Sequence, residues 1–222
     1  MFPFPIVPAL SDMDISLVTN TNTYDQANNS GLVSMPSGIV AGDIIVVCQV
    51  KTNSSIATDY NSYGTGFTRA HYAGNGSDGC MVASYKIADG TEGGTSIGGF
   101  ISTTTGYEWA NASVWRPSKT ASTVAVQDKN SSGYTGGNPA PQTLNCSNSA
   151  YATIAFGLGY EATNPQLTWS PDTPQLNIRY TGGTADMEIN ASAFKKNEGV
   201  DVTVDLPDYG NTCLISFYLE VY

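Results

Sequence analysis

The side chains that acid–base chemistry would need are sparse in this sequence. His71 is the only histidine among 222 residues, so a mechanism or a metal site that uses two histidines is excluded. A His-dependent triad stays open, but the setting Arg69-Ala70-His71-Tyr72 is typical of a hydrogen-bonded histidine in a strand. The sequence contains no G-x-S-x-G and no H-E-x-x-H, so neither a serine-hydrolase elbow nor a zincin helix can be placed.

Acidic residues offer two further arrangements. Asp186 and Glu188 are two residues apart, so on a strand they share a face, as the acid and base of a glycosidase would. The alternative, which we favour, is an acidic strand edge that faces solvent. Asp201, Asp205 and Asp208 supply oxygen atoms but lack the spacing of a calcium-binding loop. We therefore expect no catalytic residue, no metal site and no cofactor.

Aromatic side chains are better candidates for a binding surface. Trp109 and Trp115 share the parity of one predicted strand, so both face a ligand or both face the core, and the core is favoured for Trp115. Tyrosines in loops are stronger candidates, since tyrosine is enriched at protein contacts. The candidate loop contacts are Tyr60, Tyr63, Tyr134 and Trp169.

These side chains must be positioned by β-strands, because no segment shows a helical period over 11 residues. The clearest strand follows the turn residues Gly42-Asp43, where an apolar and largely β-branched run from Ile44 to Cys48 predicts burial on both faces. Residues 22–30 and 51–65 are predicted polar loops. We predict strands at 15–20, 31–35, 43–50, 67–72, 80–87, 96–103, 108–116, 151–160, 166–169, 175–180, 187–194, 200–206 and 212–221.

The two halves of the chain look alike. Segments 69–74 and 179–183 each lead through a turn to a strand with the pattern Ala-Ser followed by an aromatic residue and lysine. The sequence predicts an all-β fold, a jelly-roll-like antiparallel β-sandwich with internal duplication, over residues 14–222. Its half-repeats are about 14–130 and 142–222, joined by a Gly/Pro/Ser-rich stretch at 131–141. Two small sandwiches are the alternative.

The amino-acid composition indicates which classes of partner to expect. Charged residues make up 13% of the chain, about half the usual share of roughly 25%, which suits close packing against another protein. The net charge of -10 argues against nucleic acid as a partner. No apolar run approaches 20 residues, so we expect no membrane span. The cysteines are scattered and are expected to be reduced thiols that act as small apolar residues; they are Cys48, Cys80, Cys146 and Cys213.

Residues 1–13 are predicted to form an extended N-terminal arm. Pro3, Pro5 and Pro8 disfavour a helix and favour an extended chain. The positive n-region and long apolar h-region of a signal peptide are lacking, so none is expected. The apolar side chains of the arm either fold back onto their own domain or dock on a neighbouring subunit. These interface candidates are Phe2, Phe4, Ile6 and Val7.

Four motifs in the first half give the chain a family resemblance. They are Gly42-Asp43 with its apolar strand, Gly66-Phe67-Thr68, Tyr85-Lys86-Ile87-Ala88-Asp89, and a Trp-containing strand that ends at Arg116. This order resembles the jelly-roll β-sandwich proteins of tailed-phage virions, in which a GDLLV…GW…YYK.A pattern recurs. The resemblance covers mainly residues 31–116, with a fainter echo in 143–221. It departs at Phe67, where the pattern has tryptophan.

The resemblance implies a non-enzymatic structural protein of a virion, assembled in the host cytoplasm. Its first form is a capsid decoration, or cement, protein that stabilises the head by binding the major capsid protein or other virion proteins. A homo-oligomer, such as a trimer on a lattice axis, would fit that role. The alternative is a carbohydrate- or receptor-binding module of a tail or fibre. A glycan-degrading jelly roll is the third interpretation.

Overall fold

The described part of the chain is built from β-strands, and these strands pair in antiparallel fashion. A computed structural model describes residues 13–25, 31–52, 63–75, 79–101, 108–135, 139–145, 150–161, 167–171, 173–180, 186–195, 198, 201–206 and 212–222. Its strands are β1 (Ile15–Asp25), β2 (Val33–Ser34), β3 (Ile44–Thr52), β4 (Thr68–Asn75), β5 (Gly79–Ile87), β6 (Ser96–Ile97), β7 (Glu108–Pro117), β8 (Val124–Thr135), β9 (Gln142–Leu144), β10 (Ala152–Glu161), β11 (Thr168–Ser170), β12 (Leu176–Tyr180), β13 (Asp186–Lys195), β14 (Val202–Asp205) and β15 (Thr212–Val221). The predicted all-β, antiparallel sandwich is confirmed. Within these ranges no helix is long and apolar enough to cross a bilayer.

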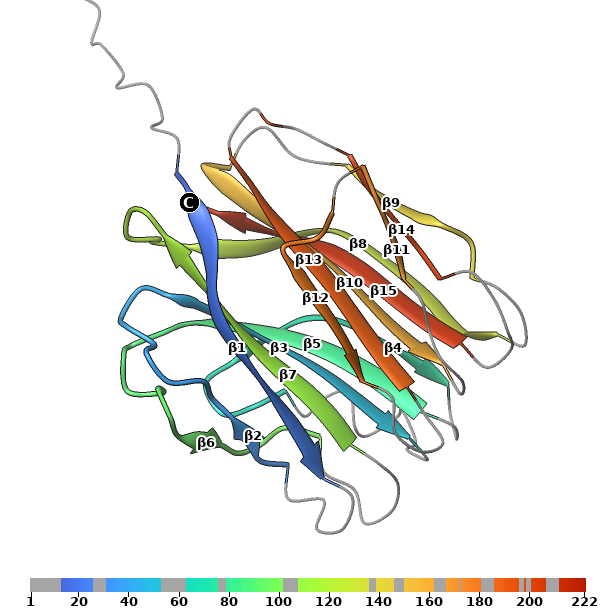
Figure 1. Cartoon of the computed structure of the whole chain (residues 1–222), viewed down its shortest axis with the longest axis horizontal. Helices are drawn as coiled ribbons and strands as arrows, with labels where there is room; N and C mark the ends of the chain where they lie inside the picture. The colour runs from blue at the N-terminus through green and yellow to red at the C-terminus, as the bar shows by residue number, and fades with distance from the viewer. Residues whose placement is uncertain are drawn as a thin grey trace, which may run out of the picture.

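Two five-stranded sheets form the centre of the molecule. The first has the order β1-β7-β3-β5-β4, and the second has the order β12-β13-β10-β15-β8. A ladder of β2 and β6 covers the outer face of the first sheet, and a ladder of β11, β14 and β9 covers that of the second. Figure 1 shows these four layers in sequence from lower left to upper right.

The two sheets repeat one strand order. If β1, β7, β3, β5 and β4 are matched to β8, β15, β10, β13 and β12, every neighbour in the first sheet has its counterpart in the second. The outer pair β2-β6 likewise matches β9-β14, with β11 as an addition. The second set of strands therefore begins at Val124. The jelly-roll assignment itself stays a prediction, because a jelly roll has eight strands in two Greek keys.

Strand β3 lies at the middle of the first sheet and is buried on both faces, as its apolar run predicts. Ile44 and Val46 face the central core between the two large sheets, whereas Ile45 and Val47 face the outer core under β2. Because successive side chains point to opposite faces, only a run without polar alternation can satisfy both cores. Full burial of each such side chain contributes about 1.5–3 kcal/mol before entropy costs.

The central core is aromatic as well as aliphatic. Trp109 and Trp115 both face it and are 1% and 0% exposed, so the shared face of these residues is the core face. The Trp115 ring meets Phe156 edge to face at 5.7 Å between centroids. Cys48 and Cys213 lie in the same core as free thiols, and burial raises the pKa of each to about 12. These thiols therefore act as apolar groups.

Glycine allows the outer ladder to approach the second sheet closely. A Cβ atom at Gly157 in β10 would lie 2.5 Å from the Cγ1 atom of Val204 in β14 and 3.4 Å from the Trp169 ring in β11. A side chain at this position would push that ladder outward. The absence of a side chain at Gly157 therefore sets the spacing between the two layers.

One strand extends beyond its predicted range, and another was not predicted. β1 continues to Asp25, through the first part of the predicted loop 22–30, and β8 occupies 124–135, which includes the start of the predicted joining stretch 131–141. Both are edge strands. An edge strand keeps one side open to solvent, so its sequence can remain polar and resemble a loop.

Candidate functional site

The motifs that carry the family resemblance meet at one end of the first sheet. Gly42 adopts a φ of +91°, which favours glycine. The turn at Gly42 directs the chain through Asp43 into β3. The Gly42 N–H donates to the carbonyl of Ala88 and the Ala88 N–H donates to the carbonyl of Asp43, at 2.9 and 2.7 Å. These bonds join the start of β3 to the end of β5, close to Arg116, which directly precedes Pro117, the last residue of β7.

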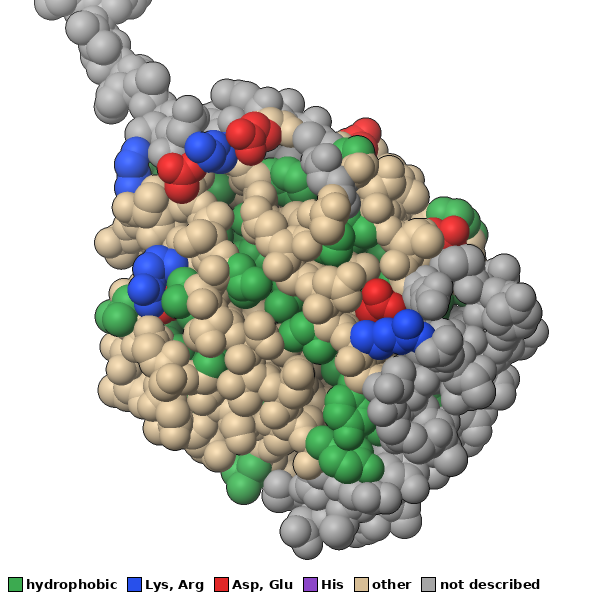
Figure 2. Space-filling view, in the orientation of Figure 1, with side chains coloured by type: hydrophobic (Ala, Val, Ile, Leu, Met, Phe, Trp, Pro, Cys, Tyr) green, Lys and Arg blue, Asp and Glu red, His purple; other side chains and the backbone are tan. Residues whose placement is uncertain are grey.

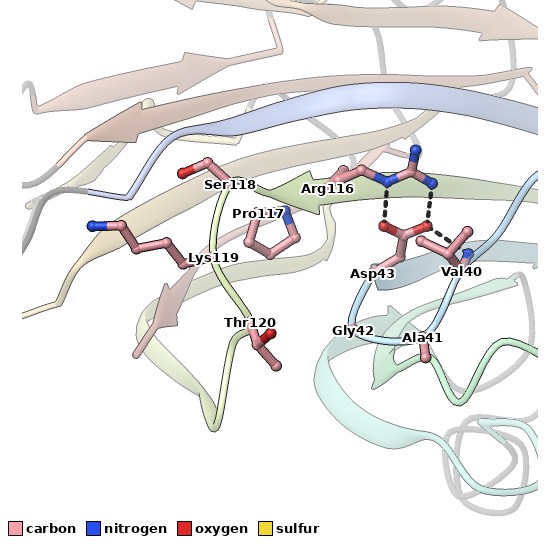
Figure 3. Close-up of a pocket in the computed structure, with 9 residues that line it drawn as sticks. All are labelled: Val40, Ala41, Gly42, Asp43, Arg116, Pro117, Ser118, Lys119 and Thr120. Carbon is pink, nitrogen blue, oxygen red and sulfur yellow. Dashed lines mark hydrogen bonds and ion pairs between the residues drawn. The ribbon is translucent and has the colours of Figure 1, made fainter.

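An ion pair between the buried Asp43 carboxylate and the partly exposed Arg116 side chain joins the elements of this corner (Figure 3). Arg116 donates from Nε to Asp43 Oδ1 at 2.7 Å and from Nη2 to Asp43 Oδ2 at 2.8 Å. Oδ2 also accepts the Val40 N–H at 2.9 Å. The Asp43 side chain is 1% exposed, and its hydrogen bonds raise the pKa of Arg116. A hollow of about 260 Å³ lies between this turn and the segment Pro117–Thr120.

A second charged group completes the corner. Lys86 Nζ lies 2.6 Å from Glu92 Oε1 and 3.1 Å from Asp89 Oδ2. Hydrogen bonds from Thr91, and then from Lys86, lower the pKa of Asp89 to about 2. Burial acts to raise the pKa of Glu92, but hydrogen bonds from Lys86 and from backbone N–H groups outweigh it, so the pKa is lowered. Both carboxylates are therefore charged near neutral pH and engaged by donors.

This corner is built to hold loops together. A general acid or base near neutral pH needs a pKa near the working pH and access to substrate, whereas Asp89 and Glu92 have lowered values. The cation of Arg116 is already held by Asp43 in a bidentate pair, and Lys119 points away from that pair (Figure 3). The corner therefore stabilises the ends of β3, β5 and β7.

His71 lies in β4 and connects the first large sheet to β8, the neighbouring edge strand of the second. Its Nε2 lies 2.9 Å from the carbonyl oxygen of Asn130 in β8; a carbonyl can only accept, so Nε2 carries the hydrogen of this bond. Burial first, and then the charges of Lys129 and Arg69, lower its pKa below the usual 6.5. Its partner is a backbone carbonyl, so the arrangement matches the strand histidine that the sequence predicts.

Glu188, one member of the predicted acidic pair, is buried in the folded protein. Burial raises its pKa, although the Leu167 N–H donates to its carboxylate at 3.0 Å and Arg179 lies opposite it on β12. Its side chain is 5% exposed, which differs from the expected solvent-facing edge. The side chain of Asp186 and all of Asp208 lie outside the described residues. Among the residues that are described, no group of three or more potential metal ligands occurs.

A buried ionic cluster lies on the outer face of the first sheet. Lys51 Nζ is 3.7 Å from Glu108 Oε2, and these two side chains are 0% and 4% exposed. Gln49 donates to Glu108 Oε1 at 2.5 Å and accepts the Ile101 N–H at 3.2 Å. Sequence patterns gave no sign of this cluster, since Lys51 was assigned to the start of the predicted loop 51–65 and Glu108 is the first residue of a mostly apolar strand.

The aromatic residues predicted as loop contacts do not form one surface. Tyr63 is half-buried, forms an isolated bridge with Phe100 and packs beside the cores on the first sheet. Trp169 lies in β11 and packs against the outer core of the second sheet. Tyr134 falls in strand β8 rather than in a loop, because that strand pairs with β15. Tyr60 lies outside the described residues. The four arm candidates also lie outside them: Phe2, Phe4, Ile6 and Val7.

A different aromatic group lies where the edges of the two large sheets meet. The group consists of Tyr24 of β1, Trp109 of β7 and Tyr180 of β12. Its ring centroids are 5.5 Å apart for Tyr24 and Trp109, 5.3 Å for Tyr24 and Tyr180, and 5.2 Å for Trp109 and Tyr180. Tyr24 keeps 40% of its surface exposed. Figure 2 shows an apolar patch where the ends of β1 and β12 lie in Figure 1. We call the line between β1 and β12, with the side chains that face it, the seam.

The seam continues along β1 away from Tyr24. Asn20 and Asn22 are exposed and lie in register with the core-facing positions Ser113 and Asn111 of β7. At the far end a hollow of about 410 Å³ is lined by Ile15, Ser16, Leu17 and Gln175. Sequence analysis missed this group because it assigned 22–30 to a loop. Alternation of Thr21 and Thr23 with these polar residues was the available signal for a longer strand.

No protein-family model matches the chain, and no curated protein and no solved structure matches it significantly. The family resemblance therefore rests on the residues that form the corner around Asp43.

Proposed function

We propose that this chain is a non-enzymatic structural protein of a phage virion, in the form of a capsid decoration protein that binds the major capsid protein. The observation that carries the proposal is the corner around Asp43. The residues of the virion-protein motifs are used there in ion pairs and backbone bonds that join strands. Motifs of this kind maintain a scaffold and supply no acid–base pair.

The surface supports a role in binding other proteins. Most of the face in Figure 2 consists of backbone and uncharged polar side chains, with few charged groups. The cores of protein interfaces are depleted of charged residues, so such a surface can be buried at low desolvation cost. The apolar side chains of the predicted arm, residues 1–13, would add contact area on a neighbouring subunit at about 25 cal/mol per Å² before ordering costs.

Electron cryo-microscopy of virions that carry this chain tests the proposal. We expect four-layered β density at repeated positions on the head lattice, arranged about a symmetry axis if the chain is a trimer. Deletion of residues 2–10 is expected to weaken attachment to heads while the thermal unfolding of the isolated protein is unchanged. Density confined to the tail would refute the decoration role and favour the tail or fibre alternative.

A further inference from the structure

We propose that the seam between β1 and β12 is a binding site for an uncharged oligosaccharide. The proposal does not depend on a place in the virion, because it uses only the described residues at this edge of the sandwich. Three observations carry it: an exposed aromatic face, a row of carboxamides, and the lack of charge on the side chains that face the seam.

The aromatic face is that of Tyr24. The three centroid distances are nearly equal, so Trp109 and Tyr180 lie on the same side of Tyr24, in directions about 60° apart. The Tyr24 ring is within 23° of parallel to Trp109 and 30° of parallel to Tyr180. Tyr24 is 40% exposed. A ring held by two aromatic neighbours is a rigid platform for the C–H face of a sugar.

The carboxamides are oriented from below by a buried residue. Asn111 is 1% exposed and donates from Nδ2 to Asn22 Oδ1 at 2.9 Å, with longer contacts of 3.4 Å to Asn20 Oδ1 and the Thr21 carbonyl. Because the oxygens of Asn20 and Asn22 face Asn111, their NH₂ groups point away from it. Residues two apart on a strand are about 6.5 Å apart. The edge thus presents two amide donors, from Asn20 and Asn22, on the same strand as Tyr24.

The remaining contents of the seam suit a neutral ligand. The residues that face it from β1 are Ile15, Leu17, Asn20, Asn22 and Tyr24, and from the other side Gln175, Leu176, Ile178 and Tyr180. None carries a charge, whereas an anionic or cationic ligand would require a counter-charge. From Leu17 to Tyr24 the strand spans about 20 Å, which accommodates several sugar units. Uncharged hydroxyl groups of a sugar can accept hydrogen bonds from the NH₂ groups of Asn20 and Asn22.

A peptide added as a further strand is the main competitor, and the geometry disfavours it. Strand addition needs a continuous row of backbone donors and acceptors on the edge. β1 has a bulge between Leu17 and Thr19, and a bulge interrupts the regular edge and twists it. Side-chain recognition by Asn20, Asn22 and Tyr24 is unaffected by that bulge.

An array of neutral oligosaccharides, including chitohexaose, maltohexaose and cellohexaose, tests the proposal with the full chain. The best binder is then measured by calorimetry and by tryptophan fluorescence, since Trp109 lies against Tyr24. We expect Tyr24→Ala to weaken binding about tenfold, Asn22→Ala to weaken it, and Tyr24→Phe to retain it. Tyr72→Ala is the matched control, because Tyr72 is 37% exposed at the other edge of the same sheet.

Thermal unfolding of each variant separates loss of binding from loss of folding. The proposal is overturned if no neutral oligosaccharide binds at millimolar concentration, or if only charged glycans bind. It is also overturned if Tyr24→Ala and Asn22→Ala bind as well as the unaltered protein, or if Tyr72→Ala weakens binding equally. Tail or head location in the virion has no bearing on these outcomes.

Discussion

Substitution of Glu108 by glutamine is expected to be one of the most destabilising single changes of charge in this protein. Glutamine keeps the shape of the side chain and a carbonyl oxygen for Gln49, but it leaves the ammonium of Lys51 buried without its carboxylate. At 3.7 Å and an effective dielectric constant of 20, the attraction between the two charges is about 4.5 kcal/mol. Removal of one member of a buried pair typically costs about 3–5 kcal/mol, so the two estimates agree.

Equilibrium unfolding in urea measures this effect. We expect the free energy of unfolding of Glu108→Gln to fall by about 3–5 kcal/mol and the urea midpoint to fall by more than about 1 M. Adding Lys51→Met should recover most of the loss, because an apolar side chain of similar length removes the buried charge. Asp14→Asn is the control. The Asp14–Lys195 pair is shorter, at 2.6 Å, but its side chains are 63% and 52% exposed, so little change is expected.

Two results would refute this reasoning. A loss below about 1 kcal/mol in Glu108→Gln would mean that solvent reaches the Lys51 ammonium and that the pair is screened as a surface pair is. A full loss that persists in the Lys51→Met, Glu108→Gln double variant would place the cost in the Gln49 and Ile101 hydrogen bonds instead of in the charge.

Three further predictions concern other parts of the fold. The pKa of His71 is lowered in the folded state, so the unfolded chain binds more protons and stability should fall as the pH drops below about 6.5; His71→Gln should reduce that fall in urea titrations at successive pH values. Gly157→Ala places a Cβ 2.5 Å from Val204 and should cost about 1–3 kcal/mol of stability through overpacking. The same substitution should cost less when it is added to a Val204→Ala variant than when it is made in the unaltered protein, as melting temperatures will show. Asp43→Ala should lower the melting temperature more than Asp43→Asn does, because asparagine still accepts the Val40 N–H.

Apolar periodicity was sufficient to predict most of the fold. Residues 44–48 and 213–221 are buried throughout, and burial on both faces leaves a largely apolar run in the sequence. The similarity of the two halves was also visible, since strands in equivalent places carry similar patterns. β8 was missed because an edge strand such as 124–135 has only one buried face and its polar residues resemble those of a loop.

The chemistry of the sites was less predictable than the strands. The pairing of Asp43 with Arg116, or of Lys51 with Glu108, joins residues that are 73 and 57 positions apart in the sequence, and only the strand register brings them together. The seam depends on which two sheet edges face each other, which no local pattern encodes. Tyr24 therefore gave no signal, whereas Trp169 was conspicuous by residue type and packs against the outer core.

The chain passes from the first large sheet to the second only once, between Pro117 and Val124. Because both sets of strands share one order and meet through one core, the molecule is equivalent to a dimer whose two subunits are joined in a single polypeptide. The joint makes their association intramolecular, so the native state does not depend on protein concentration. A chain cut at Lys119 would regain that dependence: two fragments, each with one face of the central core exposed, should fold only upon binding each other.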